Sequence, residues 1–332
     1  MIISKTPLRC SFFGGGTDFP EYYHAGKYGY GTVLSTALNM YVYIMVSKRF
    51  DDYIRVCYRE QEFVKSVDEI HHNIIRESLK LLNIDKGIDI VYSADIPLSS
   101  AGVGLASSSA LAVGVLNALY AYKGQYVTPA QIAKEACKIE IEKIGNPMGI
   151  QDQYATACGG FKQYKFNSDD SVTITEMPGG TEVRKKLQKN LLLYYTGITR
   201  YSSTILGEQE QKIRDQMEHL DHMVEMAEKA KRLLAERHVE EWGYMLDEAW
   251  QLKKQYAAAV SNPDIDEMYD KAKKAGAVGG KILGAGGGGF MLLFVPEEKQ
   301  FDVKKAMKAY KLVNFKFEAE GTRIIFSEQN RE

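Results

Sequence analysis

One short segment constrains the fold of this chain more than any other. The run Gly102-Val-Gly-Leu-Ala-Ser-Ser-Ser-Ala110 leads directly into the apolar stretch Leu111–Leu119, which has the composition of a buried helix. Glycines allow a sharp backbone turn, and the free N–H groups at a helix N-terminus favour an anion. The pattern predicts a glycine loop that opens a buried helix with serines at its start. A plain small-residue cap packed on a sheet is the alternative interpretation.

The loop matches neither of two common nucleotide-binding motifs. The chain has no G-K-[ST] step, so it lacks a Walker A motif. A Rossmann fingerprint needs glycine where Ser107 stands and an acid about 20 residues later, but the first acid after the loop is Glu135. A serine hydroxyl in such a loop can also ligate Mg²⁺. We therefore predict a phosphate-binding loop formed by Gly102, Gly104, Leu105, Ala106, Ser107, Ser108 and Ser109.

A second segment presents two acids on either side of a turn. Thr128-Pro129 has the signature of a helix start, and we expect the helix to run to about Ile144, before Gly145-Asn-Pro147. Glu140 lies near the end of this helix, and Asp152 lies just beyond the turn. Two separate acids suit two roles, one on a metal ion and one beside a reacting hydroxyl. Taken alone, they are equally explained as a surface charge and a helix cap.

The third segment is glycine-rich and precedes an apolar strand. Lys281-Ile-Leu-Gly-Ala-Gly-Gly-Gly-Gly-Phe290 formally matches the protein-kinase glycine loop, but the HRD and DFG signatures are absent from the chain. Four consecutive glycines are entropically costly in a mere hairpin. We therefore expect the backbone around Gly286 and Gly287 to approach a substrate or a phosphate closely.

The order of the predicted elements indicates a mixed fold. Tyr41–Val46 and Tyr53–Tyr58 are rich in aromatic and branched residues, and Asp51-Asp52 between them predicts a hairpin. Residues 203–237 are predicted to be helical, and Phe290–Val295 to be a strand. Because strands and helices do not alternate regularly, we predict an α+β fold rather than a doubly wound parallel sheet.

Length and turn signals indicate two domains. The 332 residues are about twice the length of a typical single domain. The turn-rich stretches Ser168–Ser171 and Pro178–Gly180 precede the apolar run Leu191–Tyr195. We place the boundary here, which gives domains of residues 1–185 and 186–332.

Charge and cysteine usage limit the partners. The formal net charge of −1 argues against nucleic acid or a membrane surface as a partner. None of the four cysteines forms a C-x-x-C pair, so we expect free thiols in a reducing compartment. The N-terminal residues lack the apolar core of a signal peptide, and we expect a cytoplasmic monomer or homodimer.

Together the segments resemble the GHMP kinases, in order and across both halves of the chain. Thr6-Pro-Leu-Arg-Cys-Ser-Phe-Phe-Gly-Gly-Gly-Thr-Asp18 is similar to the substrate motif of that family. The serine loop resembles its phosphate motif, and the glycine run resembles its third motif. The resemblance implies an S5-like α/β N-terminal domain, a ferredoxin-like C-terminal domain, and ATP and Mg²⁺ as cofactors.

The resemblance also implies a role for individual residues. Asp152 matches the acid beside the reacting hydroxyl, and Arg9 matches the basic residue that stabilises the developing alkoxide. Ser108 and Glu140 match the Mg²⁺ ligands. Whether Asp152 acts as a base or only positions charge stays open. The expected substrate-binding residues are Gly14, Gly15, Gly16, Thr17, Asp18, Arg200, Gly286 and Gly287.

The same comparison suggests a substrate. Gly149-Ile-Gln-Asp-Gln-Tyr154 and Thr196-Gly-Ile-Thr-Arg200 resemble family members that act on the anomeric hydroxyl of D-glycero-D-manno-heptose 7-phosphate. Galactokinases carry Glu-His in place of Gly15-Gly16, and the glycines would leave room for a longer, phosphorylated sugar, with Lys27 or Arg200 completing the pocket. The alternatives are a kinase of an unphosphorylated sugar of the galactose or fucose type, and an inactive sensor.

Overall fold

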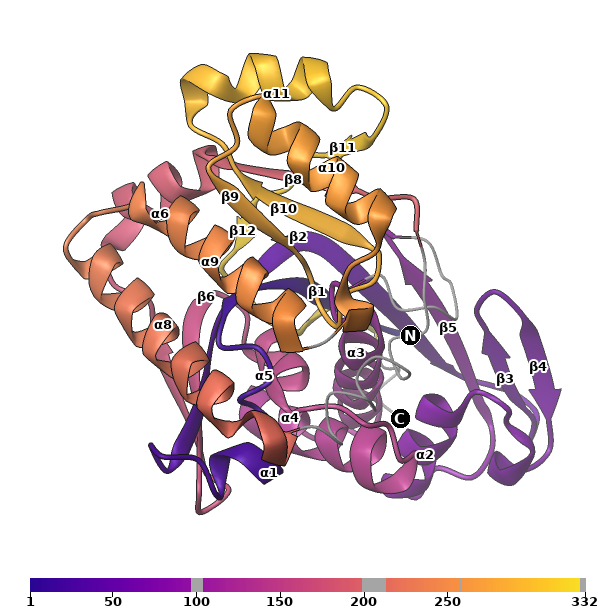
Figure 1. Cartoon of the computed structure of the whole chain (residues 1–332). Helices are drawn as coiled ribbons and strands as arrows, with labels where there is room; N and C mark the ends of the chain where they lie inside the picture. Colours follow the sequence, from indigo (N-terminus) through magenta and orange to yellow (C-terminus); the bar gives the residue numbers. More distant parts are fainter. Residues whose placement is uncertain (97–103, 199–212, 257, 329–332) are drawn as a thin grey trace.

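The computed structural model describes residues 1–96, 104–198, 213–256 and 258–328 of the chain. Strands and helices are interleaved along the sequence and build two sheets of different size (Figure 1). This mixture confirms the predicted α+β fold class. Within the described ranges, none of the helices combines the length and the apolar composition that crossing a bilayer requires.

The larger sheet is organised around one long strand, β2 (Tyr30–Lys48). The first half of β2 pairs with β6 (Phe161–Asn167), its second half pairs with β5 (Ile88–Ala94), and β1 (Ile2–Phe13) runs antiparallel along it. Consecutive residues of β2 alternate between buried and half-exposed after Met40, because side chains on a strand point to opposite faces in turn. The other strands are β3 (Ile54–Cys57), β4 (Gln61–Val64), β7 (Val172–Glu176), β12 (Phe317–Glu318) and β13 (Arg323–Ser327).

The hairpin predicted around Asp51-Asp52 is wrong. Strand β5 lies between β2 and β3, pairing antiparallel with β2 and parallel with β3. The turn does reverse the chain, but β2 offers seven register positions to β5, whereas β3 has only four residues. A local turn signal does not reveal which strand will occupy the neighbouring position in a sheet.

Helices cover one face of this sheet. The buried helix predicted after the serine loop is α3 (Ser107–Tyr122), which packs against β1 and β2. The helices α2 (Asn73–Leu81), α4 (Pro129–Cys137) and α5 (Gln151–Cys158) lie against α3. The first half of the chain also contains α1 (Pro20–Tyr23), and α6 (Gly180–Lys189) precedes the smaller sheet. Short 3₁₀ helices lie at Val67–Glu69, Ile213–Gln216, Ala258–Val260 and Glu297–Lys299.

The helix predicted to begin at Thr128 is confirmed, with one difference in its last turns. Thr128 Oγ1 accepts a hydrogen bond from the Gln131 N–H at 3.2 Å, so the helix begins where its cap predicts. After α4 the chain continues as a π-helix over Lys138–Lys143. Such wide turns occur frequently at functional sites. This turn carries Glu140, which is fully buried.

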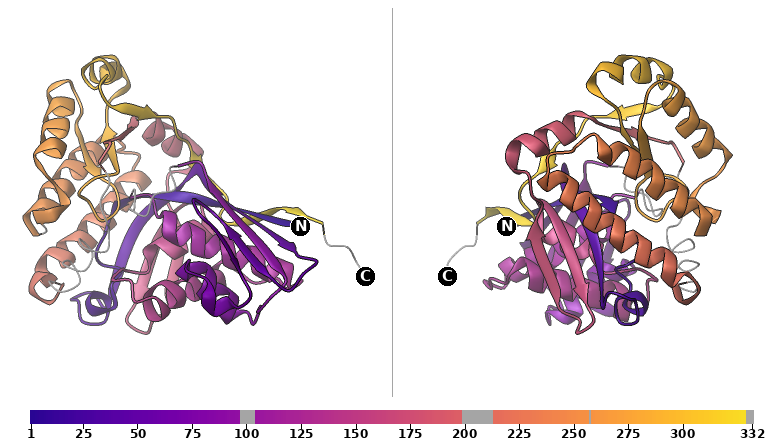
Figure 2. Two further views of the ribbon diagram at one scale, coloured as in Figure 1. Left: turned by 90° about the vertical axis from the view of Figure 1, so that its right-hand side faces the viewer. Right: turned by 60° about the vertical axis from the view of Figure 1, so that its left-hand side comes forward.

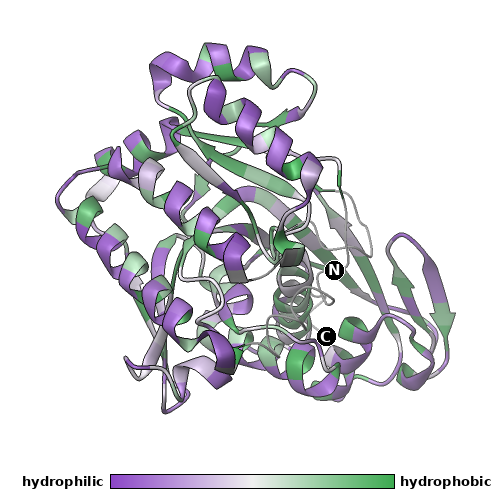
Figure 3. Ribbon diagram, in the orientation of Figure 1, coloured by the Kyte–Doolittle hydropathy of each residue, from purple (hydrophilic) through white to green (hydrophobic). Residues whose placement is uncertain are grey.

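The smaller sheet has four strands in the order β11-β8-β10-β9. Helix α9 packs on its strands, and α8 packs on α9. The helix predicted over residues 203–237 is confirmed over the range of α8, while residues 203–212 lie outside the described ones. Figure 3 shows hydrophobic strands and more hydrophilic covering helices. The elements are β8 (Leu191–Tyr195), β9 (Gly279–Ile282), β10 (Phe290–Phe294), β11 (Lys311–Val313), α8 (Met217–Ala235), α9 (Glu241–Tyr256), α10 (Pro263–Lys274) and α11 (Gln300–Ala306).

The end of the chain returns to the larger sheet. Strand β12 pairs with β2, and β13 pairs with β1. Figure 2 shows this last segment running from the smaller sheet back to the N-terminus. The Met1 ammonium donates a hydrogen bond to the Glu328 carbonyl at 2.6 Å. The boundary between residues 185 and 186 stays a prediction.

Candidate active site

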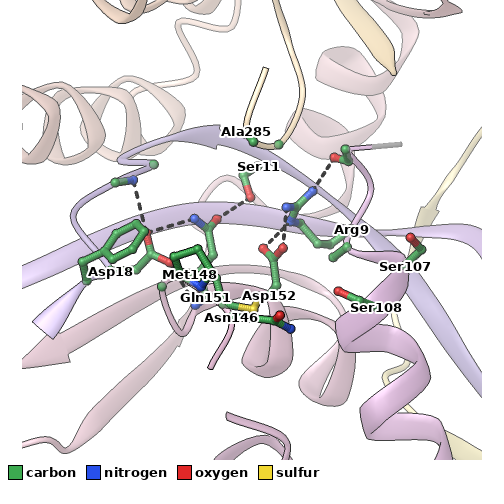
Figure 4. A pocket seen from close by; sticks show the side chains of 18 of the residues that line it. Arg9, Ser11, Asp18, Ser107, Ser108, Asn146, Met148, Gln151, Asp152 and Ala285 are labelled. Carbon is green, nitrogen blue, oxygen red and sulfur yellow. Dashed lines mark hydrogen bonds and ion pairs between the residues drawn. The ribbon is translucent and has the colours of Figure 1, made fainter. Parts of the chain in front are cut away.

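A cavity of about 600 Å³ is lined by residues from both halves of the chain. Its walls come from β1 and the loop after it, from the start of α3, from the turn before α5, and from α9 and the loop after β9. Figure 4 shows Arg9 and Asp152 between Asp18 on one side and Ser107 and Ser108 on the other. The cavity therefore brings residues from all three predicted segments together with the N-terminal motif.

Arg9 and Asp152 form a bidentate ion pair in this cavity. Arg9 Nε and Nη2 each donate to one carboxylate oxygen of Asp152 at 2.7 Å. The third nitrogen, Nη1, donates to the Gly104 carbonyl at 2.7 Å. The side chains are 4% and 17% exposed, so solvent screens this pair only partly. One guanidinium thus fixes the predicted catalytic acid relative to the serine loop.

Asp18 is the second carboxylate of the cavity. It accepts hydrogen bonds from the Gln151 backbone N–H and from Gln151 Nε2, both at 3.1 Å, and from the Gly16 N–H at 3.2 Å. Ser11 Oγ donates to Gln151 Oε1 at 2.7 Å and holds that amide in place. Burial, and secondly the charge of Asp152, raise the pKa of Asp18 to about 6. Ser11 and Gln151 were not predicted as site residues, although Gln151 lies directly before the predicted acid.

The residues of the Gly14–Thr17 turn divide into two groups. Gly14 has φ +86°, and a Cβ there would lie 1.8 Å from the Thr32 carbonyl oxygen, so only glycine fits. Thr17 is buried and donates to the Gly14 carbonyl at 2.8 Å. These two residues shape the turn, whereas Gly15 and Gly16 line the cavity. A Cβ on Gly15 would meet nothing within 4 Å among the described atoms.

The serine loop holds an unusual backbone at the start of α3. Gly104 has φ +83°, and Ala106 adopts a left-handed conformation with φ +63°, which is rare for a residue with a side chain. Ser107 and Ser108 line the cavity beside the uncapped N-terminus of α3, which offers N–H groups to an anion. The Leu105 and Ser109 side chains are buried instead, and Gly102 lies outside the described residues.

Glu140 lies directly behind the serines. Gln153 Nε2 donates to its Oε2 at 2.6 Å, but among the described residues Glu140 Oε1 and Ser109 Oγ have no well-formed hydrogen bond. Burial raises the pKa of Glu140 to about 7, although the nearby Ser109, Gln153 and Ser108 side chains act to lower it. A buried carboxylate oxygen and serine hydroxyls are oxygen ligands that Mg²⁺ prefers. The residues present therefore fit a magnesium ion.

No group of three His, Cys, Asp or Glu side chains suited to a metal occurs in the part of the chain that the structure describes. This finding does not conflict with a magnesium site at Glu140. Mg²⁺ is commonly held by one or two carboxylates together with phosphate oxygens and water, rather than by an all-protein cage.

Only part of the glycine run after β9 lines the cavity. Gly284 and Ala285 line the cavity, but Gly286 and Gly287 do not. A Cβ on Gly286 would lie 2.7 Å from Val260, and the Gly287 N–H donates to the Val260 carbonyl at 2.7 Å. Close packing of the loop on residue 260 therefore accounts for Gly286, whereas Gly287 has a φ of +73°, which favours glycine.

Lys27, one of the two basic residues expected to complete the pocket, does not line the cavity. The Lys27 side chain is 65% exposed and pairs with Glu225 at 3.7 Å, and Arg200 lies outside the described residues. Two other lysines line the cavity instead, Lys253 on α9 and Lys281 on β9. Sequence analysis also missed the wall beyond the serine loop, formed by Tyr58, Arg59, His71, His72, Asn73, Ile74 and Tyr92.

Comparisons with known proteins identify the family. Residues 67–160 match the family model "GHMP kinases N terminal domain", and residues 212–312 match "GHMP kinases C terminal". D-glycero-alpha-D-manno-heptose 7-phosphate kinase of Campylobacter jejuni is 30% identical, covering 97% of this chain and 98% of the relative. Mevalonate kinase of Thermococcus sibiricus is 28% identical over 76% of this chain and 73% of its own length.

Solved structures share the fold over the whole chain. The D-glycero-D-manno-heptose 1-phosphate kinase of Bacteroides thetaiotaomicron superimposes with a TM-score of 0.80 at 24% identity, covering 99% of this chain and all of that one. These matches confirm the expected S5-like N-terminal and ferredoxin-like C-terminal architecture. The chain therefore belongs to the GHMP kinase family and is an enzyme that transfers a phosphate group to a hydroxyl group.

Proposed function

We propose that the protein is an ATP- and Mg²⁺-dependent sugar kinase that phosphorylates the anomeric hydroxyl of D-glycero-D-manno-heptose 7-phosphate. The observation that carries this proposal is the bidentate Arg9–Asp152 pair, tied to Gly104 of the serine loop. It lies in one cavity with the hydroxyl-binding candidate Asp18 and with Ser108. Members of the GHMP kinase family use ATP, so ATP is the expected phosphate donor.

The two ends of the cavity suit the two substrates. Three N–H donors hold the Asp18 carboxylate in place, and a carboxylate accepts hydrogen bonds from sugar hydroxyls. At the other end, Ser107 and the α3 N-terminus suit the phosphates of a nucleotide. The wall formed by Tyr58, Ile74 and Tyr92 supplies flat and apolar surface for a base. The reacting hydroxyl and the transferred phosphate then meet at Asp152.

The protein's own groups have distinct roles in this reaction. Asp152 lies where it can accept or orient the proton of the sugar hydroxyl, and the Arg9 guanidinium favours the developing negative charge on that oxygen. Ser108 and Glu140 are the residues that would hold Mg²⁺, which when bound neutralises charge on the phosphate oxygens. Arg9, Ser108 and Asp152 line one cavity, and Glu140 is buried directly behind the serines. This arrangement argues against an inactive sensor, which would need neither a metal site nor a catalytic acid.

The phosphorylated heptose is supported by two observations. Among the described atoms, the space beside Gly15 is open, and both Gly15 and Asp18 line the cavity. The relative from Campylobacter jejuni carries heptose 7-phosphate in its name and matches almost the whole chain. A sugar that already bears a phosphate at its far end must receive the new phosphate elsewhere, and we assign it to the anomeric carbon.

A substrate panel tests this proposal. The protein is incubated with ATP, Mg²⁺ and one of heptose 7-phosphate, unphosphorylated heptose, galactose, fucose or mevalonate, and the products are followed by phosphorus NMR. We expect rapid turnover of heptose 7-phosphate, with a new resonance coupled to the anomeric proton. Faster turnover of a plain sugar would replace the proposal by the galactose- or fucose-type kinase, and no turnover of any acceptor would favour the sensor.

The proposed magnesium ligands lead to a separate prediction. Glu140→Gln and Ser108→Ala should each raise the Mg²⁺ concentration at half-maximal rate by about tenfold, because each removes one oxygen ligand from the ion. The measurement is a magnesium titration at saturating ATP and sugar. Glu142→Gln is the matched control, since Glu142 lies in the same π-helix but is exposed. Unchanged magnesium dependence in both variants would contradict the assignment.

A further inference from the structure

Two lysines of the second half of the chain reach the reaction cavity. Lys253 Nζ donates a hydrogen bond to the Gly284 carbonyl at 2.6 Å, and Lys281 Nζ donates to the Phe12 carbonyl at 3.0 Å. Both line the cavity, and Lys281 is only 6% exposed. An ammonium group has three N–H donors, and each lysine forms only this one hydrogen bond within the described part of the chain. Donors on both side chains are therefore available for a ligand.

Neither lysine forms an ion pair with a carboxylate of the residues that the structure describes. Among the described residues, no carboxylate oxygen lies within 4 Å of either ammonium nitrogen, whereas neighbouring lysines are paired: Lys254 with Asp266 at 3.2 Å and Lys273 with Asp247 at 2.9 Å. Burying an unpaired cation is costly, so such groups are normally paired with an anion. Their position in a cavity indicates that the anion comes from a ligand.

The electrostatics of the pair agree with this conclusion. Burial, followed by the charges of Lys281 and Arg9, holds the pKa of Lys253 well below its usual range. Burial lowers the pKa of Lys281 to about 8. The charge of Cys10 acts to raise this pKa, and the charge of Arg9 lowers it further. An anion that binds between these cations would relieve their mutual repulsion and restore the charged form.

The backbone places both lysines over the catalytic pair. Gly284, which accepts from Lys253, packs so closely on the serine loop that a Cβ there would lie 2.6 Å from Gly104 Cα. Gly104 is also the residue whose carbonyl Arg9 binds. Phe12, which accepts from Lys281, directly follows the cavity residue Ser11 on β1. The lysines therefore lie beside the point where phosphate and hydroxyl meet.

We propose that Lys253 and Lys281 together bind a phosphate group in the reaction cavity. The proposal rests on the proposed function, in which both the nucleotide and the sugar carry phosphates. Contact between Gly284 and the serine loop favours the γ-phosphate of ATP as the ligand, and the phosphate of the sugar is the other source of the same chemistry. The two lysines would hold the transferred group in line with the hydroxyl at Asp152.

Binding measurements with two nucleotides test the proposal. Lys253→Met and Lys281→Met keep most of the side-chain volume and remove the charge, and Lys254→Met, one residue further along α9, is the control. If the ligand is the γ-phosphate, the affinity of each variant for a non-hydrolysable ATP analogue should fall about tenfold or more, while its affinity for ADP stays unchanged. A tenfold loss is the scale of one charge-assisted hydrogen bond. This measurement contains no sugar, so its result stays valid even if the proposed sugar substrate is wrong.

The second arm addresses the sugar phosphate. If that group is the ligand, both nucleotide affinities stay unchanged, and the preference for heptose 7-phosphate over heptose in kcat/KM should fall about tenfold. Variants with normal melting temperatures and no change in either arm would overturn the proposal.

A measurement on the unchanged protein covers the case in which a variant does not fold. Acetic anhydride is used to label lysines, and the extent of labelling at Lys253 and Lys254 is compared by mass spectrometry. The ATP analogue or heptose 7-phosphate should protect Lys253 about tenfold more than Lys254, because a bound phosphate engages the ammonium. Equal labelling of Lys253 with and without either ligand would overturn the proposal.

Discussion

Replacement of Asp152 by Asn is expected to lower kcat by at least about 100-fold, the scale of positioned acid–base catalysis. The structure gives the reason, because both carboxylate oxygens of Asp152 accept from Arg9 at 2.7 Å. An asparagine offers one oxygen and would turn its NH₂ group toward a guanidinium N–H, so the pair loses both charge and geometry. The fold and ATP binding should persist, since Asp152 lies at the cavity surface with 17% of its side chain exposed.

The measurement combines kcat at saturating substrates with ATP-analogue affinity and melting temperature. Arg9→Met should likewise reduce turnover more than nucleotide binding. If the two residues act as one unit, the Arg9→Met/Asp152→Asn double variant should lose little more activity than the worse single variant. Near-normal turnover of Asp152→Asn would remove this residue from the mechanism, and a collapse of nucleotide affinity with normal kcat in Arg9→Met would make Arg9 a nucleotide contact.

The second large effect concerns substrate choice. We expect heptose 7-phosphate to be preferred over unphosphorylated heptose by about 10²-fold or more in kcat/KM, or about 3 kcal/mol, which one or two charge-assisted hydrogen bonds can supply. Gly15→Glu should reduce this preference about tenfold by placing bulk and negative charge beside the phosphate. The position can accept a side chain, because a Cβ there meets nothing within 4 Å among the described atoms.

Two controls separate charge from volume at this position. Gly15→Gln fills the same space without charge, and Gly15→Ala tests the backbone alone. Gly16 is less suitable, because its φ is +95° and a Cβ would lie 3.2 Å from Leu220 Cδ2. Equal rates on heptose and heptose 7-phosphate in the natural protein would contradict the substrate proposal and favour the plain sugar kinase.

The sequence predicted the parts of the site that short patterns encode. The serine loop, the helix after it, and the turn between Glu140 and Asp152 all depend on neighbouring residues, and the structure has them where the pattern placed them. The meeting of Arg9 with Asp152, 143 positions apart, came from the resemblance to a family and not from the pattern. Spacing alone carries no information about which distant segments share a cavity.

The failures have the same physical origin. The false hairpin before β3 arose because strand order in a sheet is decided by long-range pairing with β5. Lys253 was missed because on a helix rich in charge nothing local separates a lysine that lines a cavity from one that faces solvent. The packing of Gly286 against Val260 was not foreseen, because a glycine required by a neighbouring backbone looks identical in sequence to one required by a ligand.

The return of β12 and β13 to the larger sheet affects how the protein can be recombined with its relatives. A chimaera made with one crossover near residue 185 would exchange the smaller sheet together with two strands that belong to the other sheet. Those foreign strands would have to match the side chains of β1 and β2 in register. An exchange that respects the architecture needs two junctions, one before β8 and one between β11 and β12, so the smaller sheet is transplanted as an insert.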